Sequence, residues 1–180
     1  YFNEIPRWDE TPGEKLVQLT AQKKPEGFER WEQTNVYQQR QAGYVVATVT
    51  CPLGDLTSSQ MRSLADIAAR YAGGNVRTTV EQNLVLRWVP QDKVTELYTE
   101  LKAIGLGDPG AGSIVDVVAC PGTDTCKLGI ASSRGLAGEL RTRLTEKSAA
   151  MEQAIRDLRI KISGCFNSCG QHHVADIGFL

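Results

Sequence analysis

The hydrophobic positions of this chain follow two periods, one of strands and one of helices, that alternate along its middle part. Residues 44–50, YVVATVT, are rich in β-branched residues and predict a strand, which Pro52 and Gly54 end. Thr57 and Gln60 then have the spacing of a capping box at a helix start. The apolar residues behind this cap recur at helical spacing: Leu64, Ile67, Ala68 and Tyr71. A strand followed by a helix is therefore predicted here.

The alternation continues to residue 107. Residues 76–80 and 84–89 predict two strands joined by a turn at 81–83, and a helix with one apolar face follows. Pro90 opens this helix, and two glycines, Gly105 and Gly107, close it. The order β-α-β-β-α is most of a ferredoxin-like split βαβ unit. We therefore expect a ferredoxin-like half-domain over residues 41–107.

Residues 108–180 predict a second unit, of α/β type. Residues 108–112 form the expected boundary loop, and residues 114–119 predict a strand that leads directly into Cys120. The elements expected after it are a helix capped near Ser132 or Ser133, a second helical stretch over 146–158, and strands at 159–163 and 175–180. The predicted fold class is α+β, with an incomplete second unit.

Residues 1–40 differ from both units. They are polar and irregular, yet they carry several large aromatic residues: Trp8, Phe28, Trp31 and Tyr37. A free tail rarely has so many, so we expect a lead-in segment that packs against the rest of the chain. Because the sequence opens on Tyr1 and stops after an apolar run, we also expect a fragment of a longer protein.

Composition narrows the function classes. The 180 residues are 41% apolar and 23% charged, as in an ordinary globular protein. The net charge of −1 gives no sign of a nucleic-acid partner. No apolar stretch approaches membrane-spanning length, and nothing resembles a secretory signal. We expect a cytoplasmic protein that binds neither membrane nor nucleic acid.

Four cysteines carry the most chemical information. Cys120 and Cys126 stand as C-x5-C, and Cys165 and Cys169 stand as C-x3-C, 38 residues further on. Four thiolates are the usual ligands of a cubane iron–sulfur cluster. Small and turn-forming residues surround both pairs, so the backbone can wrap an inorganic core and direct N–H groups at its sulfurs. Each pair also follows a predicted strand, and open α/β sheets bind ligands at the carboxyl ends of their strands.

Three other interpretations of the cysteines remain open. Structural zinc sites favour shorter steps, and neither pair has the common two-residue gap. Disulfides would need an oxidising compartment. Inert buried thiols account well for a single residue such as Cys51, but badly for two close pairs.

A second constellation lies in the predicted hairpin. Arg77 and Thr79 share one face of a strand, and Gln82 and Asn83 lie in the turn that follows. Such a cluster could bind the carboxylates of a polar cofactor, with Arg77 as a bidentate clamp. The simpler alternative is a solvated hairpin with an exposed arginine.

Together the two constellations resemble the siroheme-dependent nitrite and sulfite reductases, over residues 28–180. In that family C-x5-C and C-x3-C cysteines hold a 4Fe–4S cluster behind a ferredoxin-like half-domain, and an R-x-T-x-x-Q-N segment helps to bind siroheme. The resemblance implies that Cys169 also bridges to the siroheme iron. The implied cluster ligands are Cys120, Cys126, Cys165 and Cys169. The implied siroheme contacts are Arg77, Thr79, Gln82, Asn83, Asn167 and Gly170.

The activity that the resemblance implies is six-electron reduction, of nitrite to ammonia or of sulfite to sulfide. The absence of a flavin or nicotinamide motif favours a separate electron donor such as ferredoxin. Family members have two related halves, this chain resembles the second, and the residues that hold the substrate anion come mainly from the first. We therefore assign no catalytic residue. The alternative function is a non-catalytic 4Fe–4S electron-transfer module.

Overall fold

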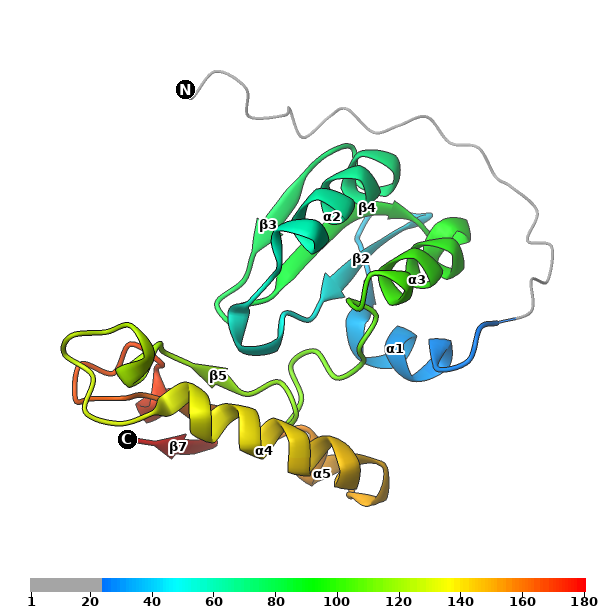
Figure 1. Cartoon of the computed structure of the whole chain (residues 1–180). Helices are drawn as coiled ribbons and strands as arrows, with labels where there is room; N and C mark the ends of the chain where they lie inside the picture. The colour runs from blue at the N-terminus through cyan, green and yellow to red at the C-terminus, as the bar shows by residue number, and fades with distance from the viewer. Residues whose placement is uncertain (1–23) are drawn as a thin grey trace.

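The computed structural model describes residues 24–180 and shows two units, each with its own sheet and hydrophobic core (Figure 1). The first sheet is antiparallel in the order β1-β2-β4-β3, and the second is parallel in the order β5-β6-β7. The fold class is α+β, as predicted. None of the helices in the described part of the chain is both long and apolar enough to span a membrane.

The first unit contains the expected β-α-β-β-α order. Its strands are β1 (Val36–Gln38), β2 (Tyr44–Val49), β3 (Val76–Thr78) and β4 (Leu84–Pro90). Its helices are α1 (Phe28–Asn35), α2 (Ser58–Tyr71) and α3 (Val94–Ala103). The capping box of α2 is present: the Gln60 N–H donates to the Thr57 hydroxyl, and the Thr57 N–H donates to the Gln60 side chain. Local sequence therefore positions this helix as predicted.

The segment expected as an irregular lead-in contributes two regular elements to this unit. Helix α1 packs Phe28 and Trp31 against Tyr98 of α3, with ring centroids 5.5 Å and 5.1 Å from Tyr98 respectively. Strand β1 pairs with β2. The expected packing is confirmed for these residues, whereas the expected irregularity is wrong for 28–38. Tyr37 is exposed, and Trp8 lies outside the described residues.

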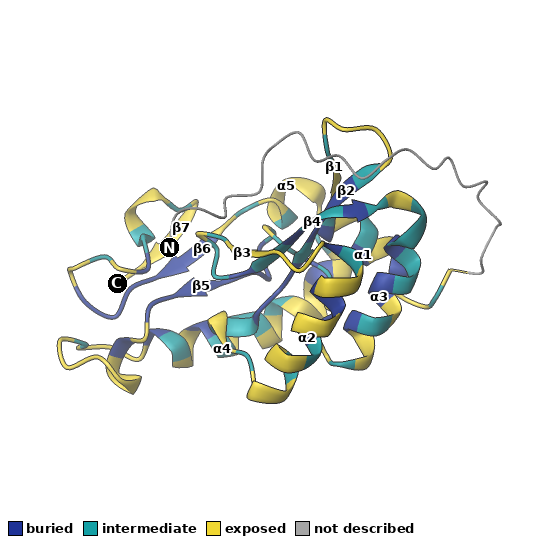
Figure 2. Ribbon diagram, turned by 90° about the horizontal axis from the view of Figure 1, so that it is seen from above, coloured by how far each residue is buried: buried dark blue, intermediate teal, exposed yellow. Residues whose placement is uncertain are grey.

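The second unit places a helix against a short parallel sheet. Its strands are β5 (Val118–Ala119), β6 (Ile160–Ile162) and β7 (Ile177–Phe179), and its helices are α4 (Ser133–Lys147) and α5 (Gln153–Arg156). Figure 2 shows that β5 and β6 are buried, with α4 alongside them. The core beneath α4 includes Ile114, Val117, Ala137 and Ile162. Ser132 is the N-cap of α4, as expected, although its side chain makes no capping hydrogen bond.

Two predicted elements are interrupted by breaks in the backbone. The strand predicted at 114–119 is reduced to β5 because Asp116 turns the chain: its carboxylate accepts from the Gly112 N–H at 2.8 Å, and its own N–H donates to Ser113. The helical stretch predicted over 146–158 is interrupted because Met151 is extended, so only a 3-10 turn and α5 form. In both places a local break ends a pattern that continues in the sequence.

Candidate functional site

The two cysteine-bearing loops lie side by side at one end of the second unit (Figure 1). Cys120 directly follows β5, and Cys165 follows β6 after two intervening residues, so both loops leave the carboxyl ends of neighbouring parallel strands. Backbone hydrogen bonds join them: the N–H groups of Ile130 and Ala131 donate to the Gly164 carbonyl at 2.8 and 3.1 Å. The predicted location of the cysteine pairs is confirmed.

Glycines allow this close approach of the two loops. A Cβ added at Gly164 would lie 2.7 Å from both Gly122 Cα and the Ala131 carbonyl oxygen, and one at Gly129 would lie 2.6 Å from the Gly122 carbonyl carbon. Gly170 packs against the Ile162 carbonyl so closely that a Cβ there would clash with it. The loops therefore form one compact backbone cradle in which larger residues do not fit.

The four cysteines differ in exposure. Cys120 and Cys165 are buried, whereas Cys126 and Cys169 are exposed. The Cys120 sulfur accepts a hydrogen bond from the Gly164 N–H at 3.1 Å and lies 3.5 Å from the Ser133 hydroxyl. Burial alone would raise the pKa of the Cys120 thiol, but the hydrogen bonds from Ser133, Gly164 and Gly122 together lower it. The cradle thus favours a thiolate at this position.

The backbone around Cys120 suits an iron–sulfur cluster. Within residues 24–180, no group of three Cys, His, Asp or Glu side chains converges as the ligands of one metal ion. A cubane cluster instead separates its thiolate ligands by its own width, and backbone N–H groups directed at sulfur, as Gly164 supplies, suit it.

The turn between β3 and β4 lies at the boundary between the two units. Gln82 exchanges two hydrogen bonds with the backbone of Ala119, and Asn83 is buried between the Cys51 N–H and the Asp116 carboxylate. Thr79 uses its hydroxyl oxygen to accept from two N–H groups of its own turn. Three of the four predicted siroheme contacts of this segment are therefore engaged by the protein itself.

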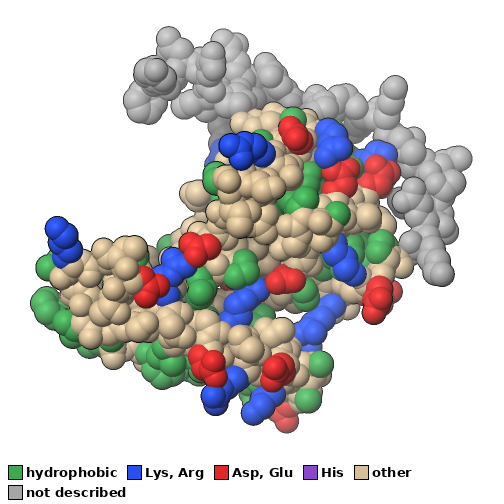
Figure 3. All heavy atoms as spheres, in the orientation of Figure 1, with side chains coloured by type: hydrophobic (Ala, Val, Ile, Leu, Met, Phe, Trp, Pro, Cys, Tyr) green, Lys and Arg blue, Asp and Glu red, His purple; other side chains and the backbone are tan. Residues whose placement is uncertain are grey.

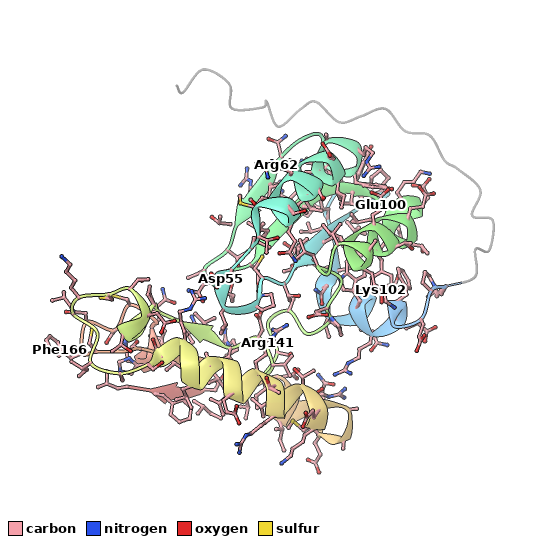
Figure 4. All side chains as sticks on the ribbon, in the orientation of Figure 1. Asp55, Arg62, Glu100, Lys102, Arg141 and Phe166 are labelled. Carbon is pink, nitrogen blue, oxygen red and sulfur yellow. The ribbon has the colours of Figure 1, made fainter. Side chains whose placement is uncertain are left out.

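Besides Cys169, two predicted cofactor contacts are exposed: Arg77 and Asn167. Arg77 lies on β3, an exposed strand, and Asn167 lies in the loop between Cys165 and Cys169. Phe166, labelled in Figure 4 at the far end of the second unit, is 79% exposed beside Asn167. Gly170 is buried. The contribution of these residues to siroheme binding stays a prediction.

A cavity of about 310 Å³ lies between the units, and Figure 3 shows the surface hollowed where they meet. Its lining includes Cys51, Gln82 and Asn83 from the first unit and Ala119, Pro121 and Arg134 from the second. Arg134 makes ion pairs with Asp55 of the first unit and with Asp124 of the first cysteine loop. This volume is at the lower end for small-molecule pockets, so it would hold only part of a macrocycle.

Sequence reasoning missed the contacts that join the units or anchor the loop between them. Figure 4 shows Asp55 and Arg141 at this boundary; the Arg141 guanidinium lies 3.2 Å from the Asp108 carboxylate and donates to the Val115 carbonyl. Asp116 could have been noticed in the sequence, because it is a lone acid in an apolar run. Nothing in the sequence indicates the contacts of Arg134 and Arg141, because their partners are distant along the chain.

Comparison with known proteins supports the same interpretation. Residues 37–104 match the family described as the nitrite/sulfite reductase ferredoxin-like half domain, and residues 110–180 match the nitrite and sulphite reductase 4Fe-4S domain. The chain belongs to the nitrite and sulfite reductase family. The family matches cover both units of the fold, and the second covers all four cysteines of the paired loops.

Relatives of this reductase-family chain include enzymes named for either substrate. Spinach chloroplastic ferredoxin–nitrite reductase is 35% identical over 155 residues, which are 85% of this chain and 25% of that protein. Sulfite reductase [ferredoxin] 1 of Mycolicibacterium paratuberculosis is 35% identical over 130 residues, which are 70% of this chain and 23% of that protein. The chain thus spans about a quarter of the length of these relatives.

Solved structures share the fold. The Mycobacterium tuberculosis NirA protein superimposes with a TM-score of 0.68 at 29% identity, covering 81% of this chain and 27% of that one. Dissimilatory sulfite reductase I gives a TM-score of 0.61 at 14% identity over 74% of this chain and 32% of that one, a likeness that concerns the fold alone.

The buried acid Asp116 gives a testable pH dependence. Burial raises the pKa of its carboxyl, against the opposing hydrogen bonds from Gly112 and Asn83. An acid with a raised folded-state pKa binds protons more tightly in the folded state, so the free energy of unfolding falls as pH rises from the usual carboxyl range through the raised pKa. In Asp116→Asn the amide oxygen can still accept both hydrogen bonds. We expect this variant to be on the order of 1 kcal/mol more stable at about pH 7, and not at about pH 3.

Denaturant unfolding of the parent and Asp116→Asn at both pH values measures this difference. A variant that is destabilised at neutral pH more than in acid would show that the folded state favours the ionised carboxylate, which contradicts the expected direction.

Proposed function

We propose that this chain is the cluster-bearing part of an oxidoreductase that carries out the six-electron reduction of nitrite or sulfite. The observation that carries the proposal is the glycine-packed cradle, which brings the C-x5-C and C-x3-C loops together. Both loops lie within the residues that match the 4Fe-4S domain. The names of the relatives support the substrate class and ferredoxin as donor. Because the chain spans about a quarter of their length, the activity would belong to a longer protein.

The residues of the cradle suit a 4Fe–4S cluster, and the exposed ones suit a macrocycle against it. The four residues that would ligate the cluster are Cys120, Cys126, Cys165 and Cys169, and the exposed Cys169 sulfur would also be available to the siroheme iron. Arg77 presents an exposed guanidinium that can bind carboxylates. When bound, the two cofactors would accept electrons one at a time and deliver them to the substrate anion.

The protein itself would orient and shield these groups. The Gly164 N–H holds a hydrogen bond to the Cys120 sulfur, which stabilises negative charge there. The joined loops exclude water from Cys120 and Cys165, which are both buried. Cysteines that ligate iron must stay reduced, which supports a reducing compartment such as the cytoplasm.

Metal and spectral analysis tests the proposal. The complete protein encoded by the natural reading frame that contains this chain should be purified anaerobically from cells that make siroheme. We expect about four inorganic sulfides per chain, at least as many irons, and a visible siroheme band. A colourless protein that contains zinc would contradict the proposal. Cluster absorbance without a siroheme band would instead indicate the electron-transfer module.

A further inference from the structure

The turn between β3 and β4 contains an unusual backbone conformation. The Thr79 N–H donates to the Asn83 carbonyl at 2.9 Å and closes the reversal. Within it, Gln82 has φ +64°, in the left-handed region. In short hairpin loops this position is usually glycine, because a Cβ is unfavourable there. A non-glycine outlier held in this way points to a role for its side chain.

The Gln82 side chain reaches across to the second unit. Its amide nitrogen donates to the Ala119 carbonyl at 2.9 Å, and its amide oxygen accepts from the Ala119 N–H at 3.2 Å. The Gln82 side chain thus pairs with both the N–H and the carbonyl of Ala119, in the way that the backbone of a neighbouring strand would. Ala119 is the last residue of β5 and directly precedes Cys120.

The turn is fixed on both sides, so the reach of Gln82 is well defined. Asn83 accepts from the Cys51 N–H at 2.9 Å within the first unit and donates to the Asp116 carboxylate at 2.7 Å in the second. On the other side, the Gln82 side chain packs against Gly54, where an added Cβ would lie 3.4 Å from Gln82 Cβ. Contacts on both flanks therefore hold the amide in register with Ala119.

We propose that Gln82 is a positioning residue, which fixes the Ala119 peptide and so sets the Cys120 thiolate relative to the rest of the cradle. The inference rests on the proposed function and deepens it. It gives the Gln82 amide a task different from the siroheme contact that the family resemblance implies, because both ends of the amide are already used by the backbone. Through this residue the half-domain supports the cluster loop of the other unit.

Gln82→Gly is the main test, because glycine suits the left-handed backbone and the variant should keep its fold. We expect its melting temperature to stay close to that of the parent. The Ala119 N–H should exchange with solvent about tenfold faster, since it loses its acceptor. Cluster absorbance should bleach several-fold faster in EDTA, and the midpoint potential of the cluster should shift. Measurements use the complete protein in holo form for bleaching and potential, and in apo form for exchange.

Two further variants separate positioning from general stability. Gln82→Glu keeps the acceptor for the Ala119 N–H but repels the Ala119 carbonyl. The Ala119 N–H should therefore exchange more slowly in Gln82→Glu than in Gln82→Gly. Gln60→Ala is the matched control: its amide also donates to a backbone carbonyl, that of Ile104, but within the first unit. It should lower the melting temperature and leave Ala119 exchange, bleaching and potential unchanged.

Several results would overturn the proposal. One is parent-like Ala119 exchange and bleaching in Gln82→Gly. Another is equally fast bleaching in Gln60→Ala, which would show a general effect of stability. Loss of siroheme alone, with Ala119 exchange unchanged, would assign the amide to the cofactor. If the parent contains no iron at all, the proposed function fails, yet the apo exchange measurement still decides whether Gln82 holds Ala119.

Discussion

Cys169→Ser should abolish the cluster and the multi-electron reduction that depends on it. A serine hydroxyl is a harder and far less acidic ligand than a thiol, so it should not replace a thiolate on iron. Mutation of a residue that only supports a metal ligand already lowers metal affinity or activity about 10–100-fold. Loss of Cys169, the proposed bridging ligand, should exceed that range. Iron and sulfide content, the visible spectrum and reduction of nitrite and sulfite should be measured on the complete protein.

Cys51→Ser is the matched control for this prediction. Cys51 is buried in the first unit, where its thiol lies 3.6 Å from the Val49 carbonyl, and burial raises its pKa, as expected of an inert thiol. A hydroxyl can keep that hydrogen bond, so cluster content and activity should stay near those of the parent. If Cys51→Ser lost the cluster while Cys169→Ser kept it, the ligand assignment would be wrong.

Local signals in the sequence were enough to predict most elements of the first unit. The capping box at Thr57 and Gln60 and the β-branched run that forms β2 depend on neighbouring residues only, and both are confirmed. The strand expected at 114–119 forms only at its end, as β5. Its apolar pattern continues, but the Asp116 carboxylate accepts hydrogen bonds from the nearby Gly112 N–H and from Asn83 of the other unit, and the chain turns there. A local turn and a tertiary contact together override strand propensity.

The candidate site was likewise predictable from the sequence only in part. The strand-like runs before Cys120 and Cys165 predicted that each pair follows a strand, which the structure confirms. These runs could not show which way the turn residues face. Gln82 meets Ala119 across 37 residues of sequence, and Arg134 meets Asp55 across 79. No periodicity records such contacts, because they arise only when the two units dock. The assignment of siroheme contacts in this turn therefore remains a prediction to test.

Gly170→Ala should disrupt the second cysteine loop through backbone packing alone. A Cβ at this position would clash with the Ile162 carbonyl, which belongs to β6 and cannot move as a flexible side chain could. Any shift would also strain the hydrogen bond from the Gly170 N–H to the Ser163 hydroxyl, 3.2 Å long. We expect the free energy of unfolding to fall by about 3 kcal/mol, which is the upper part of the range for overpacking. Cys169 should move with its neighbour, so cluster content should fall as well.

Gly138→Ala provides the opposite expectation in the same unit. Gly138 lies inside α4, and an added Cβ would meet only a Leu53 methyl at 3.8 Å, which is ordinary contact. Alanine in a helix interior is more favourable than glycine by about 0.5–1 kcal/mol, so this variant should gain stability and keep its cluster. Thermal unfolding and iron content of the two variants, measured side by side, give the comparison. Equal stability of both, or a full cluster in Gly170→Ala, would show that the loop can shift to accept a methyl group, and that the close packing of Gly170 on Ile162 does not determine where Cys169 lies.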